Sequence, residues 1–475
     1  MTAKELFNDV FTKAGNYGLL AKNERSTISD PRGNAIIRDN LEASAFTNGT
    51  AFFAFISNEE ATSGQYSDFS FVVFPDSAEL VGACVVGLVV GTSGFRNDYQ
   101  LASLPGLRRL FLKLNSPDSF FKTSFDDTDS NTPGLLNEIK TNYHSLQTVI
   151  ESYKTKIQAC KIVRFDDVNA LDDIYAWLAT YAKMRGWGNA AQKKAVEAQL
   201  EKIPQPEQPN EEEEIKSLLE KRKYVVLQGA PGTGKTYTAL KIAQDYDQIF
   251  FEQFHAETNY SDFVYGLEPD TTQSTTQLKF KPKEGILYQA VKYALENPNN
   301  NVLLIIDEIN RANLSNVLGP IFYLFEYLSG KRTVEIKIGD LKLKKLPDKL
   351  FVIATMNTAD RSLAVVDFAL RRRFAWYTLR PHKVKAEDGK IFMDKIYNKV
   401  TDIFLEYATD DELNLQPGQS YFIVNKDNRD KEMRERLIYE LMPLIKEYLA
   451  EGYLLKAKDS FYDLFLKETG RTMYE

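Results

Sequence analysis

One short segment near the middle of the chain combines glycines with a lysine and a threonine. The segment GAPGTGKT fits the pattern G-x-x-x-x-G-K-[ST] in full, and it lies between an apolar run, KYVVLQ, and a helical stretch, YTALKIAQDY. Glycines allow a tight turn in which several backbone N–H groups point at phosphate oxygens, and the helix start adds positive charge. This pattern predicts a phosphate-binding loop formed by Gly229, Ala230, Pro231, Gly232, Thr233, Gly234, Lys235 and Thr236.

Two side chains of this loop have predicted roles in nucleotide chemistry. Lys235 is expected to reach the β- and γ-phosphates, and the Thr236 hydroxyl is expected to bind Mg²⁺. The alternative is a glycine turn that carries Lys-Thr by chance, which the flanking strand and helix make the weaker interpretation. The loop therefore predicts that the chain binds a nucleoside triphosphate together with Mg²⁺.

A pair of carboxylates ends the apolar run NVLLIIDE. Asp307 and Glu308 come at the carboxyl end of this predicted strand, which is where an open parallel sheet places its ligand groups. Asp307 is expected to hold Mg²⁺, and Glu308 is expected to orient and polarise the attacking water. An isolated acid pair after a strand is commonly a solvated loop. Here the pair follows a complete phosphate-binding loop by about 70 residues, which favours the functional interpretation.

The segment MNTADRS, Met356–Ser362, places an amide, an acid and a guanidinium directly after the apolar run LFVIAT. One interpretation is a turn and helix cap, because SLAVVDFALRRRF beyond it has helical character. The other interpretation places LFVIAT in the sheet, beside the strand that ends in Asp307. Asn357 would then lie at the strand tip next to the γ-phosphate, with Asp360 and Arg361 on the same loop.

Three consecutive arginines, Arg371, Arg372 and Arg373, end the helical stretch ALRRRF. Cations at a helix C-terminus complement the helix dipole, so a solvated cap is one interpretation. The other is an arginine finger, which reaches the nucleotide of a neighbouring subunit and stabilises charge in the transition state. Because the sequence offers no other candidate cation for that role, we favour a finger at Arg372 or Arg373.

The elements that must position these residues alternate between strand and helix. The runs KYVVLQG, QIFFEQF, NVLLIIDE and KLFVIAT lack polar alternation, as expected of a parallel sheet covered on both faces. Helical stretches lie between them, which indicates a βαβ series. After Arg380-Pro381 the strands are expected to stop, and IFMDKIYNKVTDIFLEYA and EMRERLIYELMPLIKEYLAEG predict helices. We expect an α/β P-loop NTPase core over residues 215–380 and an α-helical lid over residues 381–475.

The segment EKIPQPEQPNEEEE, residues 201–214, predicts a proline- and glutamate-rich linker. It separates this core from residues 1–200. That front part contains the strand-like runs AFFAFI, FSFVVF and Val81–Gly91, and helical spacing over Gly134–Gln158 and Ala170–Trp187. We expect a multidomain chain whose front part is an α+β domain, a small sheet followed by helices, that serves recognition or docking.

The composition excludes several classes of protein. The chain has 475 residues and a net charge of −7, so it carries no strong overall field for nucleic acid or an anionic membrane. Cys84 and Cys160 form neither a metal-ligand spacing nor a disulfide framework, so we expect two reduced apolar thiols. The N-terminus lacks the apolar centre of a signal peptide, and the longest apolar run is too short to span a bilayer. We expect a cytoplasmic protein without a membrane partner.

Four segments together resemble the McrB family of AAA+ proteins. They are GAPGTGKT, QFHAETNYSDFVYGLEP, LLIIDEINRANLSNVLG and ATMNTADRSLAVVDFALRRRF, and YELMPLIKEYL near the end is similar to the family's lid. DEINRA is shared with MoxR-like AAA+ chaperones, whereas MNTADRS followed by the Leu-Arg-Arg-Arg-Phe helix end is similar to McrB specifically. The resemblance covers residues 215–455 and leaves the front part unassigned. It implies a hexameric ring that uses GTP and works with McrC, a second subunit that carries the nuclease and cleaves modified DNA in phage defence.

By matching position, the resemblance also implies roles for single residues. Asn357 would be the sensor, Asp360 and Arg361 would belong to the signature loop, and Asn310 would lie near the attacking water. Arg372 and Arg373 would act in trans. The chain departs from the family at Gln419, where GQSYF replaces a common Gly-His-Ser-Tyr-Phe and puts a lid contact at this position in doubt; the replacement of a common proline by Ala230 is minor.

Three functions remain open at this level. The first is the motor subunit of a McrB-like, modification-dependent restriction system, and the second is a MoxR-like ATP-driven remodelling protein. The third, a non-catalytic nucleotide switch, is disfavoured by the intact Glu308 and Asn357.

GTP is favoured over ATP on the resemblance alone, because a phosphate-binding loop does not touch the base. The front part could bind DNA, with Arg108, Arg109 and Lys113 as a minority candidate for phosphate contacts, or it could dock a protein. His382 has no ligand-like neighbours in the sequence.

Overall fold

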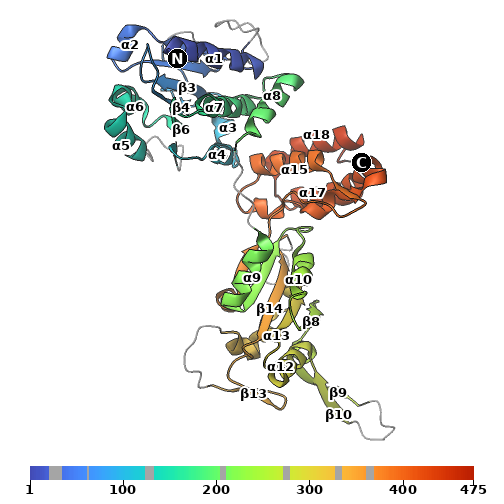
Figure 1. The fold of residues 1–475 in the computed structure, drawn as a ribbon. Coiled ribbons are helices and arrows are strands. Elements are labelled where there is room, and N and C mark those ends of the chain that lie inside the picture. The colour runs from blue at the N-terminus through green and yellow to red at the C-terminus, as the bar shows by residue number, and fades with distance from the viewer. Residues whose placement is uncertain are drawn as a thin grey trace. The chain divides into compact units, whose positions relative to one another are not determined.

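The computed structural model describes residues 1–20, 35–60, 64–122, 133–203, 210–270, 279–326, 334–359 and 368–474. Contacts between residues divide the chain into two units, Met1–Pro206 and Glu207–Glu475. In Figure 1 the first unit runs from blue to green and the second from green to red. None of the helices in the described ranges is both long and apolar enough to cross a bilayer.

The first unit is built on a six-stranded antiparallel sheet with the order β1-β2-β3-β4-β6-β5. Every residue of β3 and β4 is buried, since helices cover both faces of the sheet. The strands are β1 Ile36–Asn40, β2 Phe52–Ile56, β3 Phe69–Pro75, β4 Ala83–Val90, β5 Ser119–Phe121 and β6 Ile157–Arg164.

Alternate residues of these strands enter two separate hydrophobic cores. Phe53 and Phe55 of β2 pack with α1 and α7 on one face, while Ala54 and Ile56 pack with α5 and α6 on the other. Both faces are therefore apolar, which is why the strands read as continuous hydrophobic runs. The helices are α1 Ala3–Asn16, α2 Ala43–Thr47, α3 Tyr99–Ala102, α4 Leu107–Leu112, α5 Pro133–Asn142, α6 Gln147–Tyr153, α7 Ala170–Arg185 and α8 Ala190–Leu200.

The expectation of a small sheet followed by helices is wrong in one respect. The predicted helix Gly134–Gln158 is interrupted at Tyr143, which has φ −138°, and it ends at Tyr153. The chain then enters β6, which pairs with β4 and β5. The segment IQACKIVR contributes apolar side chains to the cores on both faces of the sheet, so sheet pairing overrides the helical spacing that precedes it. Cys84 and Cys160 are buried free thiols on β4 and β6, as expected.

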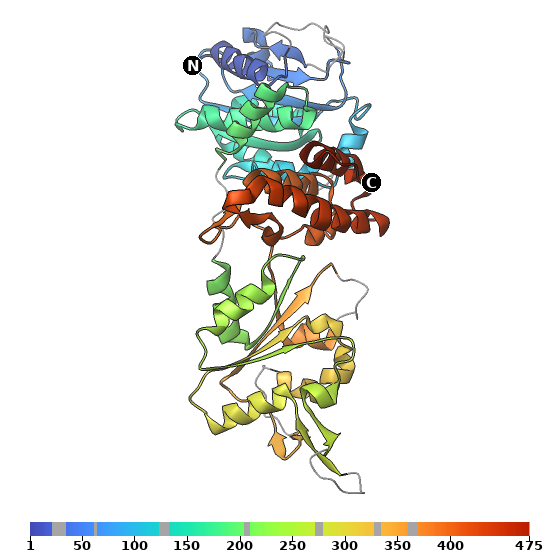
Figure 2. The same ribbon diagram turned by 90° about the vertical axis from the view of Figure 1, so that its right-hand side faces the viewer.

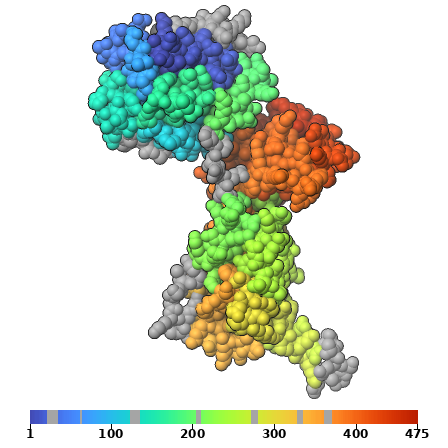
Figure 3. All heavy atoms as spheres, in the orientation of Figure 1, coloured from blue at the N-terminus to red at the C-terminus, as the bar shows by residue number. Residues whose placement is uncertain are grey.

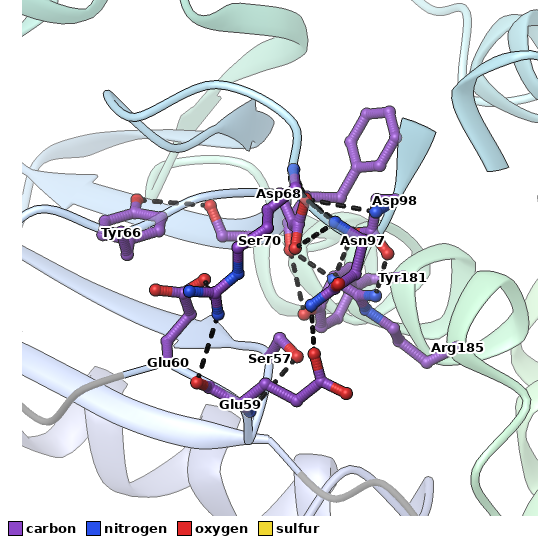
Figure 4. Close-up of polar contacts among 12 residues, drawn as sticks. Ser57, Glu59, Glu60, Tyr66, Asp68, Ser70, Asn97, Asp98, Tyr181 and Arg185 are labelled. Atoms are coloured by element: carbon purple, nitrogen blue, oxygen red, sulfur yellow. Dashed lines mark hydrogen bonds and ion pairs between the residues drawn. The ribbon is translucent and has the colours of Figure 1, made fainter. Parts of the chain in front are cut away.

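A buried polar network fixes a loop of this unit against the start of β3 (Figure 4). The carboxylate of Asp68 is fully buried and accepts hydrogen bonds from the backbone N–H groups of residues 96–98 at 2.6–3.1 Å. Asp98 in turn accepts one from the Phe69 backbone at 2.9 Å and another from Arg185 at 2.8 Å. These bonds satisfy the two buried carboxylates and tie the loop to the end of α7.

The second unit contains a five-stranded parallel sheet with the order β15-β7-β14-β11-β8. The predicted neighbourhood of LFVIAT and the strand that ends in Asp307 is confirmed, because β14 pairs with β11. The strands are β7 Tyr224–Gly229, β8 Gln248–Gln253, β11 Val302–Asp307, β14 Leu350–Asn357 and β15 Ala375–Thr378.

Helices cover both faces of this sheet, but β8 at its edge is only half covered. Helices α9 and α10 pack on one face, and α12 and α13 pack on the other. Ile249 and Phe251 of β8 are 41% and 42% exposed, so the expectation of full burial fails for this strand. The helices are α9 Glu211–Arg222, α10 Lys235–Ala243, α11 Tyr260–Phe263, α12 Ile286–Glu296, α13 Leu314–Leu318 and α14 Phe368–Arg373.

The predicted linker, residues 201–214, falls partly outside the described residues, which omit 204–209. Its last four residues form the first turn of α9. Two antiparallel ribbons also extend the core. One joins β12 Ile336–Ile338 to β13 Leu341–Leu343, and the other joins β9 Tyr265–Pro269 to β10 Phe280–Glu284. The β9–β10 ribbon projects away from the parallel sheet in Figures 1 and 2 and stands out from the core surface in Figure 3.

The lid is helical, with its own hydrophobic core, but the expectation that strands stop after Pro381 is wrong. Two three-residue strands, β16 Lys390–Phe392 and β17 Ile423–Asn425, pair antiparallel, and the first occupies the expected start of a helix. The helices are α15 Asp394–Tyr407, α16 Arg429–Arg436, α17 Met442–Ala450 and α18 Lys458–Thr469, with a π-helical turn at Leu437–Leu441 between α16 and α17.

Candidate functional site

The candidate site forms where the carboxyl ends of β7, β14 and β11 lie side by side. Asn357 at the end of β14 is in register with Gly229 at the end of β7. Asp307 ends β11, the next strand on the other side of β14. The predicted phosphate-binding loop, the acid pair and the amide therefore meet at one edge of the sheet, where open α/β folds bind their ligands.

Glycines permit the shape of the loop between β7 and α10. Gly232 and Gly234 have φ of +78° and +84°, a region that residues with a side chain rarely adopt. The Thr233 hydroxyl donates a hydrogen bond of 2.9 Å to the Ala230 carbonyl and so braces the turn. Helix α10 begins directly after the turn at Lys235, so its first N–H groups and its positive end lie at the loop.

Lys235 is held at the centre of this loop. Its ammonium group donates to the carbonyls of Gly229 and Ala230 at 3.1 and 2.9 Å, and its side chain is largely buried. A buried ammonium beside a cradle of backbone N–H groups is a site for an anion. The geometry therefore suits a phosphate chain that runs along the loop.

The residues present also suit Mg²⁺. The Thr236 hydroxyl donates a hydrogen bond of 2.7 Å to Asp307 Oδ1, and Thr355 on β14 donates to the same oxygen at 2.7 Å. A hydroxyl and a carboxylate are hard oxygen donors of the kind that Mg²⁺ prefers, with phosphate and water completing its shell.

Glu308 has an unusual backbone conformation for its residue type. Its φ and ψ are 55° and 47°, in the left-handed region, and its N–H donates to Thr355 Oγ1 at 3.0 Å. This turn lifts the chain out of β11. The Glu308 carboxylate lies 3.4 Å from Arg311 Nε and remains partly exposed. Strained backbone of this kind is concentrated at functional sites, where it aims a side chain.

Two amides lie beside the acid pair. Asn357 Oδ1 accepts the Ala359 N–H at 3.3 Å, and Asn310 Nδ2 donates to the Asn357 carbonyl at 3.4 Å. The Asn310 side chain is 3% exposed, and its Oδ1 has no hydrogen-bond partner among the described residues. A buried acceptor without a partner is costly, so Asn310 is a candidate for a contact with water or ligand.

The structure distinguishes between the candidate arginines. Asp360 and Arg361 lie outside the described residues. Arg373 is 7% exposed and donates to Glu326 at 2.8 Å, which commits it to the interior of its own chain. Arg372 has a side chain that is 69% exposed, and its contact with Glu326 is longer, at 3.4 Å. Of the two, Arg372 is the residue with the freedom to reach another chain.

The lid contacts the phosphate-binding loop directly, and Gln419 takes part. Gln419 Nε2 donates to the Thr233 carbonyl at 2.8 Å, so the contact that the sequence put in doubt is present. The backbone N–H groups of Gly418 and Ser420 donate to the carbonyls of Pro231 and Gly232 at 2.9 and 3.1 Å. Three adjacent lid residues therefore form hydrogen bonds with the loop. These bonds couple the position of the lid to the ligand of the loop.

Sequence reasoning missed one pair of residues beside the site. His382, which follows β15, lies with its Nδ1 3.8 Å from Oε1 of Glu211, the first residue of α9. Burial raises the pKa of Glu211, and the nearby imidazole opposes that rise. The two residues are far apart in the sequence and belong to no motif. Only the packing of the segment after β15 against α9 brings them together.

Comparisons with known proteins identify a match to an AAA domain family and two relatives that are named as components of restriction enzymes. Residues 224–374 match the family described as AAA domain (dynein-related subfamily). The chain is 31% identical over 264 residues to the Type IV methyl-directed restriction enzyme EcoKMcrB subunit of Escherichia coli (strain K12), covering 50% of this chain and 56% of that protein. It is 29% identical over 209 residues to the Type II restriction enzyme BsuMI component YdiS of Bacillus subtilis (strain 168), covering 40% and 59%. The chain thus spans a little more than half the length of these relatives.

Proposed function

Because this chain is a McrB-like AAA+ protein, we propose that it is the nucleotide-hydrolysing motor subunit of a modification-dependent restriction system. The observation that carries the proposal is the meeting of four groups at one sheet edge: the phosphate-binding loop, the Thr236–Asp307 pair, Glu308 and Asn357. This set suits hydrolysis of a nucleoside triphosphate rather than mere binding, because it includes Glu308, a carboxylate that is proposed to act on water.

In the proposed mechanism, each residue acts on a defined part of the nucleotide. Lys235 and the loop N–H groups bind the phosphate oxygens, and Thr236 and Asp307 would hold Mg²⁺, which would supply positive charge to the phosphates. Glu308 accepts a hydrogen bond from the attacking water and orients it toward the γ-phosphate. Asn357 holds that water or a phosphate oxygen without adding charge, and Asn310 supports the Asn357 backbone.

A neighbouring copy of the chain is proposed to complete the site. Arg372 is exposed at the end of α14, and it would supply positive charge to the nucleotide of the adjacent subunit. Ile249 and Phe251 leave an apolar surface on the edge strand β8, which supports contact with another copy. We propose that the copies form a hexameric ring, as the family resemblance implies.

GTP is the proposed substrate, and a McrC-like nuclease subunit is the proposed partner. Both of the relatives described above are named as parts of restriction enzymes, which supports a partner that cuts DNA. The first unit is proposed to recognise modified DNA or another signal of invasion. A MoxR-like ATP-driven remodelling protein is the second candidate. It is supported by the match to the AAA domain family, since that match is not to a family of restriction enzymes alone.

The test is steady-state hydrolysis of GTP and ATP by the purified chain, side by side, with oligomeric state measured by mass photometry under each nucleotide. Preference for GTP together with ring formation is the expected result. Preference for ATP would favour the remodelling protein, and the absence of hydrolysis with a McrC-like subunit present would refute the motor.

A further inference from the structure

A cavity of about 530 Å³ continues from the phosphate-binding loop toward the start of α9. Gly232 and Gly234 of the loop line it, and so do Glu211 and His382. Val384 and Ile423 add apolar wall. A nucleotide whose phosphates follow the loop would place its ribose and base in this space, which we call the α9 cavity.

The acids at the start of α9 differ in what they contact. Glu212 accepts hydrogen bonds or ion pairs from Lys216 at 2.8 Å and Lys241 at 2.5 Å, and Glu214 accepts the Tyr377 hydroxyl at 2.7 Å. Glu211 is half-buried and makes no hydrogen bond among the described residues; its neighbour His382 is 3.8 Å away. Glu211 therefore has both carboxylate oxygens available to a ligand in the α9 cavity.

His382 does not form a hydrogen bond with either oxygen of the Glu211 carboxylate. Its Nδ1 lies 3.0 Å from the Arg380 carbonyl, and because a carbonyl can only accept, Nδ1 must carry the hydrogen. The imidazole is thus oriented by Arg380 and faces Glu211 only as a nearby charge or dipole. Burial that raises the pKa of Glu211 would be offset by a ligand that donates hydrogen bonds to its carboxylate.

Gln419 is a second polar side chain at the α9 cavity with an unused acceptor atom. This side chain is 8% exposed. Its Nε2 is committed to the Thr233 carbonyl, whereas its buried Oε1 has no partner among the described residues. Because this oxygen is itself buried, the half-buried Glu211 carboxylate is the acceptor that is proposed to contact a ligand in the α9 cavity.

Acceptors at the base end of a nucleotide site discriminate between purines. The Watson–Crick edge of guanine presents two adjacent N–H donors, on N1 and on the 2-amino group, which match the two oxygens of one carboxylate. Adenine instead turns the N1 lone pair toward the same position and would be repelled. Resting on the proposed nucleotide hydrolysis, we propose that Glu211 is the specificity-determining residue, which selects guanine through a two-point contact with its Watson–Crick edge.

The test is equilibrium binding of GDP, ADP and inosine diphosphate to the full-length chain, measured by calorimetry. Inosine diphosphate lacks only the 2-amino group of GDP. Wild-type protein should bind GDP roughly 10- to 100-fold more tightly than ADP, and inosine diphosphate should fall between them, as loss of one or both donors predicts. Glu211→Gln should weaken GDP binding by roughly 10-fold or more, while ADP binding changes by less than about 3-fold.

Glu213→Gln is the matched control, because Glu213 lies in the same helical turn and is exposed. It removes the same charge near the helix start and should leave all three affinities unchanged. Equal weakening of GDP and ADP in Glu211→Gln, or equal effects of the two substitutions, would overturn the selection by Glu211. Wild-type protein that binds GDP and inosine diphosphate equally would overturn it without any variant. Failure of the wild type to bind any of the three would instead refute the proposed function.

Discussion

At the scale of single residues, the proposed hydrolysis depends first on Glu308. Glu308→Gln keeps the size of the side chain but removes the carboxylate that is proposed to orient and polarise water. We expect turnover to fall by roughly 10²-fold or more while nucleotide binding is retained. Phosphate release and nucleotide affinity should be measured on the same preparation. Turnover close to that of the wild type would show that Glu308 does not have this role.

Substitution of Arg372 and substitution of Arg373 should have different effects on turnover and stability. Arg372→Ala removes an exposed guanidinium, so we expect the free energy of unfolding to change by less than about 0.5 kcal/mol while turnover falls strongly. Arg373→Ala removes a buried partner of Glu326, so we expect a loss of about 1–3 kcal/mol in stability.

Denaturant unfolding and phosphate release, measured on both variants, separate these effects. Each substitution is the control for the other, because the residues are adjacent and contact the same glutamate. Full turnover in Arg372→Ala, or unchanged stability in Arg373→Ala, would contradict the assignment.

Residues within contiguous motifs could be predicted from the sequence, whereas residues joined only by packing could not. The pairing of Thr236 with Asp307 follows from two motifs that come after β7 and β11, the strands on either side of β14. The contact between Glu211 and His382 has no such signal, because it depends on how the chain after β15 returns to α9. The choice between Arg372 and Arg373 needed burial, which a run of identical residues does not reveal.

At the scale of elements, the lid contact on the phosphate-binding loop can be tested through Gly418. A Cβ atom at this position would lie 2.0 Å from the Gly232 carbonyl carbon, although the Gly418 backbone itself is unstrained, with φ −72°. Gly418→Ala should therefore push the lid away from the loop, and we expect nucleotide affinity to fall by roughly 10-fold or more.

Gly319→Ala is the control for that experiment. A Cβ atom at Gly319 would meet no atom within 4 Å, and its φ of −48° suits alanine. Its nucleotide affinity, measured by the same titration, should match that of the wild type. If Gly418→Ala also binds nucleotide normally, the lid contact does not contribute to the site.

The elements were predicted best where burial was uniform. The central strands β7, β11 and β14 are apolar on both faces because helices cover both faces, and this produces the continuous runs from which they were predicted. The strands β16 and β17 have three residues each, too few for a periodicity to show. The predicted helix Gly134–Gln158 failed because its last residues pair with β4, a contact distant in sequence.

At the scale of the whole molecule, the resemblance to the McrB family predicted from the motifs is confirmed by the relatives of this chain. Each of the two units has its own hydrophobic core, so recognition and hydrolysis are proposed to belong to different parts of one chain. The proposed arginine in trans makes hydrolysis a property of the assembly. A single chain would then hold a nucleotide but turn it over poorly.

Turnover of GTP per chain, measured over a range of protein concentrations from monomer to assembled ring, tests this claim most directly. Mass photometry on the same samples reports the oligomeric state. We predict that turnover per chain rises with concentration and reaches a plateau when assembly is complete. Turnover per chain that is independent of concentration, or the absence of phosphate release at every concentration, would contradict a catalytic site completed by a neighbouring subunit.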